Sequence, residues 1–433
     1  MRHWVGIRRL YEPRFQSLII TGLLAVMVAY YAVFSVVNWV TLDAAALRFD
    51  FVNYFGGAQA AAHGSDIYAE FKRSWGTQAW TVAYIYPPFF ALVLAPLTPL
   101  GLVAAGRIWL IAIQGAFIAS LWLLLRIHPE LSPIQRRLFL LAALAFMPVY
   151  VNVKFQQVAT VWLLLLTAAL WGALRRRGVL AGLFLALAAS LKVIPIFCIP
   201  LFVRLRRTSI AVAAAGLLIA ITTVTVVASP GSWQFFTVVL PRIGLGNANW
   251  DNASIDGLVS RFVELNPAAF GSATVTVGKL AVALAVLAVL GVTLWQSGQG
   301  GAESWQLRLS MAATVTALLM VSSVTWQHHL VIVLLPLACA MAWISARRPG
   351  ARYAWWALTG YVLCWIDRRS FPLPADHTVH SLATTVGVLL GTSVKLVGLA
   401  VLWALLLTMM RLEARRVRQP RHDAQGSARP AAA

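Results

Sequence analysis

The stretch LVAAGRIWLIAIQGAFIASLWLLLR, residues 102–126, decides the fold class of this chain. It has no acidic residue, and its charged side chains are Arg107 and Arg126. A helix needs roughly 20 predominantly apolar residues to cross the hydrocarbon core of a bilayer. The stretch therefore predicts a transmembrane helix, and similar apolar runs recur along the chain on both sides of it.

The composition of the whole chain extends this prediction. Its 433 residues are 60% apolar and only 11% charged, with a mean hydropathy of +0.77. Soluble domains are nearer a quarter charged, so the composition excludes a soluble enzyme and, even more firmly, a disordered chain. Lipid admits only helices and closed barrels, and the alternating ten-residue segments of a barrel are absent. We predict an all-α polytopic membrane protein.

The charges decide how many apolar spans cross the membrane. The spans lie near residues 17–40, 86–98, 102–126, 136–150, 155–174, 178–191, 193–205, 208–229, 273–295, 306–324, 328–346, 352–366 and 382–410. Arg8-Arg9 and the Arg-rich C-terminal segment both favour the cytoplasm, which requires an even number of crossings. Because span 86–98 is short and bracketed by prolines, we predict a re-entrant or surface helix there. About twelve transmembrane helices remain.

This topology separates the polar residues onto two faces. The net charge of +21 comes from basic clusters between apolar runs, the pattern of an orientation signal rather than of nucleic-acid binding. We predict a multi-pass plasma-membrane protein with both termini in the cytoplasm, a single transmembrane domain over residues 1–411 and a basic disordered tail over 412–433. Two larger extracytoplasmic loops, about 41–101 and 230–272, and the short outer junctions carry most of the chemistry-bearing residues. Ionisable groups near the membrane are costly and usually functional, so we expect the active site on this outer face.

Asp50 is the candidate general base. It follows the first predicted crossing and opens the aromatic-rich stretch Asp50-Phe51-Val52-Asn53-Tyr54-Phe55. Such a carboxylate would be partly desolvated, which raises its affinity for a proton and suits a general base. The alternative is that Asp50 caps a helix.

Basic residues at predicted outer junctions form a second group. Lys154 follows one apolar span, and Lys192 separates two others without an intervening loop. Arg368 and Arg369 come directly after another span. The positive-inside tendency disfavours cations here, so we interpret them as ligands of a lipid phosphate. The alternative is that the lysines extend along the helix to reach the interface.

A third candidate is the segment Ser322-Ser323-Val324-Thr325-Trp326-Gln327-His328-His329 between two apolar spans. One histidine of the pair would donate to a leaving phosphate oxygen or assist deprotonation, and Trp326 would contact a sugar. Adjacent helical positions point in different directions, so a metal shared by His328 and His329 is not expected. Interfacial anchoring is the alternative reading.

The second large loop, Gly246-Asn247-Ala248-Asn249-Trp250-Asp251-Asn252, is rich in amides that can hydrogen-bond sugar hydroxyls, with Asn249 as the candidate. The cysteines, Cys198, Cys339 and Cys364, have no ligand-type spacing, and no metal site is predicted. The sequence has no Walker loop and no dinucleotide-binding glycine motif, so direct use of a nucleotide is not expected.

Several of these motifs resemble glycosyltransferase family 87. They occur in order as Asp50-Phe51 with Tyr54, Gly64…Ile67-Tyr68, Tyr86-Pro87-Pro88-Phe89, Gln156-Gln157, Leu191-Lys192…Pro195 and Ser-x-x-Trp-x-His-His from Ser323 to His329. The resemblance covers about residues 45–345. It implies a GT-C-like bundle and an enzyme that needs no cofactor beyond its lipid-linked donor.

The resemblance also implies an activity. Family members transfer a sugar from a polyprenyl-phosphate donor to an acceptor on the outer face, with inversion. The matching positions make Asp50 the base, His328 or His329 a further catalytic residue, and Tyr54, Tyr86 and Gln157 contacts to substrate. We expect mannose as the sugar and a lipid-linked or cell-envelope glycan as the acceptor, with membrane lipids as partners, no nucleic acid, and a monomer. An arabinofuranosyltransferase of the same class is the alternative.

The chain departs from the family pattern in two places. It has Gln156-Gln157-Val158-Ala159 where the family often has Gly-Gln-Val-Asn, and Ser322-Ser323 where Ser-Pro is common. These departures affect the identity of the sugar more than the class of enzyme.

Two other functions are compatible with such a bundle. A transporter or flippase for lipid-linked sugars would have inverted repeats and charges deep within its spans, whereas here the ionisable residues lie at one face. A protein O-mannosyltransferase-like enzyme would carry paired acidic residues early in the first loop, where this chain has Asp50 after Arg48-Phe49.

Overall fold

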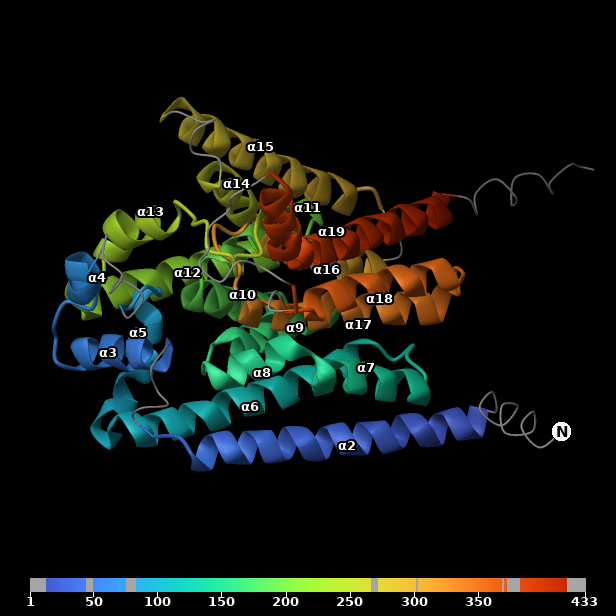
Figure 1. The fold of residues 1–433 in the computed structure, drawn as a ribbon, viewed down its shortest axis with the longest axis horizontal. Helices are drawn as coiled ribbons and strands as arrows, with labels where there is room; N and C mark the ends of the chain where they lie inside the picture. Colours follow the sequence, from blue (N-terminus) through green and yellow to red (C-terminus); the bar gives the residue numbers. More distant parts are fainter. Residues whose placement is uncertain are drawn as a thin grey trace, which may run out of the picture.

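The computed structural model describes residues 13–43, 50–74, 83–265, 272–300, 303–367, 370–371 and 382–418. No β-strand occurs among them, which confirms the all-α prediction for this part of the chain (Figure 1). The long helices are α2 (Pro13–Val40), α6 (Leu102–Ile127), α12 (Thr208–Ala228), α15 (Ser272–Ser297), α16 (Glu303–Val321) and α19 (Leu382–Arg418). The shorter ones are α3 (Asp50–Ala62), α4 (Ala69–Ser74), α5 (Pro88–Leu94), η2 (Ala95–Leu100), α7 (Pro133–Ala145), α8 (Met147–Lys154), α9 (Ala159–Leu174), α10 (Gly178–Leu191), η3 (Ile194–Phe197), α11 (Cys198–Arg204), η4 (Phe235–Val239), α13 (Leu240–Ile243), α14 (Ile255–Glu264), η5 (Gln327–Val333), α17 (Leu334–Arg347) and α18 (Ala351–Trp365).

Six described segments are long and apolar enough to cross a bilayer, or seven if the pair α7–α8, bent by 46°, forms one span. The six are Phe15–Val40, Leu102–Ile127, Thr208–Ala228, Thr276–Ser297, Gln327–Arg347 and Thr385–Val417. The chain is a multi-pass membrane protein, but the predicted count of twelve crossings is not confirmed. Several predicted spans form shorter helices, such as α9 with 16 residues and α10 with 14. The break after α10 falls at Lys192, and Pro195 lacks the N–H that a continuous helix would need there.

Packing divides the interior into two parts. A central core joins α6, α9, α10, α16, α17 and α19 around side chains such as Leu163, Leu335 and Trp343. A smaller, aromatic core lies under α3 and α5 and contains Phe51, Tyr68 and Phe90. The outer surfaces of α2, α12 and α15 expose large apolar side chains, as expected of helices that face lipid.

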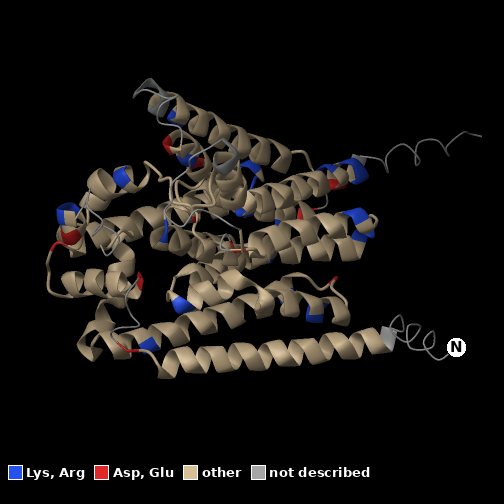
Figure 2. Cartoon of the chain, viewed as in Figure 1, with Lys and Arg blue, Asp and Glu red and all other residues tan. Residues whose placement is uncertain are grey.

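The two ends of the bundle carry different elements. Helices α3, α4, α5 and α13 gather beyond the ends of α6 and α12 (Figure 1), and we call this the site end. Lysine and arginine occur at both ends in Figure 2, and at the opposite end they mark the α17–α18 turn and the end of α19. Helix α19 continues to Arg418, so residues 412–418 of the predicted disordered tail are helical; residues 419–433 lie outside the described part.

The predicted re-entrant span 86–98 forms α5 and η2. Together they cover Pro88–Leu100, which at about 1.5 Å per helical residue is shorter than the roughly 30 Å hydrocarbon core. Both elements pack against α3, so this segment builds the wall beside Asp50.

Candidate active site

Asp50 opens α3 at the site end. An acidic residue in the first turn suits the positive end of the helix dipole. The apolar stripe of α3, formed by Phe51, Tyr54, Phe55 and Ala58, packs inward and fixes the helix. The Asp50 side chain is half-buried, so a substrate can still reach it.

Burial changes the proton affinity of Asp50. Loss of hydration raises the pKa of its carboxyl from 3.8 to about 6. A hydrogen bond from the Gln157 side chain and the charge of Lys192 act in the opposite direction and favour the ionised form. The carboxylate is therefore available as a proton acceptor near neutral pH.

Tyr54, Tyr86 and Gln157 form one hydrogen-bonded group next to Asp50. The Tyr54 hydroxyl donates to Gln157 Oε1 at 2.8 Å and lies 3.2 Å from the Tyr86 hydroxyl. All three side chains are buried. Gln156 takes a left-handed conformation (φ 53°) at the turn before Gln157, and Trp109 Nε1 donates to its carbonyl at 2.7 Å. This turn fixes the Gln157 amide, which in turn orients the Asp50 carboxylate.

Lys192 and His329 meet across the site, although 137 residues separate them in the sequence. Lys192 Nζ contacts His329 Nε2 and lies 5.5 Å from the centre of the Trp162 ring. The backbone N–H of Trp326 donates to His329 Nδ1 at 3.1 Å and holds the imidazole in this orientation. Lys192 also lies close enough to Asp50 for its charge to lower the pKa of that carboxyl.

The two histidines have different surroundings. Their rings lie 4.4 Å apart and nearly perpendicular, and it is His329 whose Nε2 contacts Lys192 Nζ. His328 Nε2 is buried and has no hydrogen-bond partner among the described residues. His329 is therefore the better placed of the two to act on a group held by Lys192.

The other predicted site residues that the structure describes make no side-chain hydrogen bond to the Lys192–His329 pair. Lys154 ends α8 with an exposed side chain and makes no ion pair in the described part of the chain. Asn249 is exposed, and its side-chain oxygen accepts from the Asp251 N–H at 2.9 Å. Trp326 is half-buried and reaches the cluster through its backbone. Arg368 and Arg369 lie outside the described residues.

Two residues of the site were not predicted from the sequence. Trp162 lies inside an apolar helix, where an aromatic residue reads as core, yet its ring faces both Lys192 and His329. Asn252 is fully buried and joins the second large loop to the histidine segment. Its amide donates to the Ser323 carbonyl at 3.0 Å, and its oxygen accepts from the Thr325 N–H at 2.9 Å. The spacing of asparagines in the loop was the available signal, but it did not distinguish Asn252 from Asn249.

A metal centre is not apparent in the described residues, because no three His, Cys, Asp or Glu side chains come together there. The three cysteines are buried and unbonded. The charged groups at the site are thus a carboxylate with a raised pKa and a lysine beside an imidazole.

A helical membrane bundle with a carboxylate, a lysine and an imidazole gathered at one end describes a membrane enzyme. The model of glycosyltransferase family 87 matches residues 84–323. The chain therefore belongs to glycosyltransferase family 87, and it is a glycosyltransferase. The matched region contains Tyr86, Gln157 and Lys192.

Two relatives are similar over most of their length. One, from Mycolicibacterium smegmatis, is a polyprenol-phosphate-mannose-dependent alpha-(1-2)-phosphatidylinositol pentamannoside mannosyltransferase, 31% identical over 72% of this chain and 75% of its own. The other, of the same name, is from Mycobacterium tuberculosis and is 27% identical over 72% of this chain and 71% of its own.

Proposed function

We propose that this protein transfers mannose from a polyprenyl-phosphate donor to a mannosylated phosphatidylinositol-type acceptor, with inversion at the anomeric carbon. The names of both relatives support the donor and the acceptor. The observation that carries the mechanism is the electrostatic coupling of Asp50 to Lys192 across one site.

In the proposed reaction, Lys192 binds the donor phosphate, and His329, whose Nε2 contacts Lys192 Nζ, donates to the same phosphate. Asp50 accepts the proton of an acceptor hydroxyl as that oxygen attacks the anomeric carbon. The bond from the anomeric carbon to the phosphate oxygen breaks, and its electron pair leaves with polyprenyl phosphate. The positive charge of Lys192 stabilises this leaving group.

A groove beside Lys192 suits the donor's lipid chain. It has a volume of about 80 Å³ and runs between α5, α10 and α12. Its lining is mostly apolar and includes Pro87, Phe89, Ile196 and Phe235. Ser190 and Val193, which lie on either side of Lys192 in the sequence, also line it, so the groove lies close to the backbone of the residue that we assign to the phosphate.

The proposal also covers the orientation of the chain in the membrane, its oligomeric state and its need for cofactors. Basic side chains at the end opposite the site favour a cytoplasmic location of that end, which puts the site on the extracytoplasmic face of the plasma membrane with both termini inside. A single chain contributes every residue of the cluster, which is compatible with a monomer. The donor already carries an activated phosphate, and Lys192 supplies the positive charge, so we expect transfer without nucleotide or added metal.

The test uses the full-length protein in nanodiscs with a phosphatidylinositol mannoside acceptor. Polyprenyl-phosphate mannose should give a mannosylated lipid whose new linkage is inverted relative to the donor, as determined by NMR, and transfer should persist in EDTA. Polyprenyl-phosphate arabinofuranose in the same assay tests the alternative sugar. Transfer of arabinose but not mannose, or retention of configuration, would refute the proposal.

A further inference from the structure

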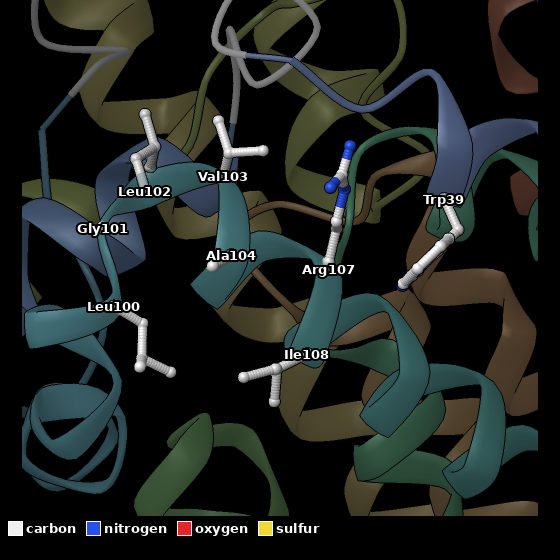
Figure 3. A pocket seen from close by; sticks show the side chains of 8 residues that line it. All are labelled: Trp39, Leu100, Gly101, Leu102, Val103, Ala104, Arg107 and Ile108. Atoms are coloured by element: carbon white, nitrogen blue, oxygen red, sulfur yellow. The ribbon is translucent and has the colours of Figure 1, made fainter.

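A second groove lies at the site end, away from Lys192. It has a volume of about 610 Å³ and is lined by Trp39, Leu100, Gly101, Leu102, Val103, Ala104, Arg107 and Ile108 (Figure 3). These residues belong to the end of α2, the end of η2 and the start of α6. The groove shares no lining residue with the groove assigned to the donor chain.

Arg107 is the charged residue of this lining, and one of its two terminal nitrogens makes no hydrogen bond among the described residues. It lies over the Trp39 ring at 5.3 Å from the centroid. One terminal nitrogen makes two long hydrogen bonds, of 3.4 Å each, to the carbonyls of Val40 and Leu42. Its Nε is buried and has no partner among the described residues. A guanidinium has five N–H donors in a planar fork that matches the oxygens of a phosphodiester.

The surroundings of Arg107 suit the boundary between headgroups and acyl chains. α2 and α6 are both long enough to span a bilayer, and the groove lies where α2 ends and α6 begins. Gly101 takes a positive φ of 78°, which turns the chain sharply from η2 into α6 and leaves the first turn of α6 on the groove. Leu100 and Ile108 approach the groove from two sides (Figure 3), so an acyl chain below the phosphate would meet apolar surface.

The groove is also connected to the catalytic carboxylate through packing. Trp109, two residues after Arg107 on α6, stacks on Phe51 at 6.5 Å between ring centres and packs edge-on to Tyr54 at 6.2 Å. Phe51 is the neighbour of Asp50 on α3. Arg107 points to the opposite side of α6 from Trp109, and it donates to the carbonyl of Leu42, which packs in the same aromatic core as Phe51. A lipid phosphate at Arg107 would therefore lie beside the core that holds the helix of the base.

We infer that this groove binds the lipid anchor of the acceptor, with Arg107 holding its phosphodiester and the apolar lining contacting its acyl chains. The inference rests on the proposed function for the nature of the acceptor. It assigns the two lipid-linked substrates to separate grooves, the donor beside Lys192 and the acceptor beside Arg107.

Equilibrium binding of a radiolabelled short-chain phosphatidylinositol mannoside to the full-length protein tests the inference without requiring turnover. Arg107→Gln should weaken this binding roughly tenfold, the effect of losing one charge-assisted hydrogen bond. Binding of polyprenyl-phosphate mannose should stay within about twofold of wild type. Arg107→Lys, which keeps the charge, should recover part of the loss.

Arg126→Gln is the matched control. Arg126 lies on the same helix, over the Trp122 ring at 5.4 Å, but at the opposite end of α6 and outside the groove. Its acceptor affinity should equal that of wild type. The inference is wrong if Arg107→Gln and Arg126→Gln bind the acceptor equally well, or if Arg107→Gln weakens donor and acceptor binding alike, as a merely structural role at the end of α2 would.

Competition with an unlabelled lipid separates acceptor binding from general binding of anionic lipids. Unlabelled phosphatidylglycerol should displace the acceptor only weakly; displacement at equal concentration would show a general site for anionic lipids and overturn the assignment. If acceptor binding depends on Arg107 but no mannose is transferred, the groove assignment stands and the proposed reaction fails. If mannose is transferred normally and Arg107→Gln changes no acceptor affinity, the reaction stands and the groove assignment fails.

Discussion

Two clusters of similar composition lie at opposite ends of the bundle, and they differ in how their charges are paired. The site end combines an acid, a cation, a histidine and a tryptophan, and the opposite end repeats these types with Glu130, Arg308, His128 and Trp305. At the opposite end, Arg308 holds Glu130 through two hydrogen bonds of 2.9 and 3.0 Å and covers the Trp305 ring at 3.8 Å. At the site end, Lys192 contacts an imidazole instead of the carboxylate.

This difference in pairing distinguishes charged side chains that stabilise the fold from those that remain available to bind substrates. A buried ion pair with bidentate geometry offsets its own desolvation and leaves little capacity for a ligand. A second such pair, Arg347 with the buried Glu413 at 2.7 and 2.9 Å, ties α17 to α19 at the same end. Asp50, by contrast, has no ion-pair partner within the part of the chain that the structure describes, and its desolvation appears as a raised pKa. Perturbed groups of this kind cluster at functional sites.

Asp50→Asn should have the largest effect on activity. Removal of a general base lowers transfer about 1,000-fold, while the donor affinity stays near wild type because the donor phosphate contacts Lys192. Stability should not fall at neutral pH. A carboxyl whose pKa is raised on folding favours the folded state most when protonated, and loses that contribution as the pH rises toward about 6.

The measurement is the initial rate of mannosyl transfer alongside the melting temperature. Asp66→Asn is the control, since Asp66 lies at the same end but accepts the Tyr68 N–H at 3.0 Å in a turn, and its activity should change less than about twofold. A rate for Asp50→Asn above a tenth of wild type would rule out the base assignment.

Glu130→Gln breaks the paired cluster and should act on stability instead of activity. It leaves the buried Arg308 guanidinium, 5% exposed, without its counter-charge. Removing one partner of a buried pair costs about 3 kcal/mol of unfolding free energy. Thermal unfolding of the nanodisc protein measures the loss, and the rate per folded molecule should stay unchanged.

Glu70→Gln provides the matched control for Glu130. Glu70 pairs with Arg73 on the surface, where both side chains are more than half exposed, so its loss should cost less than about 0.5 kcal/mol. Equal melting temperatures for the two variants would mean that the paired cluster does not stabilise the bundle.

Whether the sequence predicted a residue of these two clusters depends on how far apart its partners lie along the chain. Asp50 and Lys192 stood out locally, one at the start of an aromatic stretch and one between two apolar spans, and they do lie at one site. The Arg308–Glu130 pair joins residues 178 positions apart, and no local pattern connects them. Trp162 was hidden because its helix is apolar on every side, so periodicity could not show which face meets Lys192.

The number of membrane crossings was also only partly predictable from the sequence. Apolar composition predicted the spans, but not where they bend. Phe146 separates α7 from α8, which divides the predicted span 136–150, whereas the break at Lys192 between α10 and η3 falls at a predicted boundary. The break after α10 places Lys192 at the site, and the turn between α8 and α9 places Gln157 there, so the departure from regular spans is part of how the site is built.

Lys192→Ala should weaken donor binding, with an effect smaller than that of Asp50→Asn on the rate. Loss of a charged contact to phosphate raises the donor KM about tenfold. Lys154→Ala is the matched variant, since Lys154 is also a lysine at a helix end, but exposed and without an ion pair among the described residues. Steady-state kinetics with varied donor distinguish the two. An equal donor KM for both variants would show that Lys192 does not bind the phosphate.

The pH profile should give the smallest effect and the most direct reading of Asp50. The base must be ionised to accept a proton, and burial raises its pKa to about 6. Transfer should therefore fall about twofold between pH 7.5 and 6, and then about tenfold for each further unit of acidification. The residual rate of Asp50→Asn should lack this acidic limb, because no carboxyl remains to titrate. A limb centred near pH 4 in the wild-type enzyme would mean that the carboxylate is hydrated in the working site, and the contrast between the unpaired Asp50 and the paired Glu130 would lose its electrostatic basis.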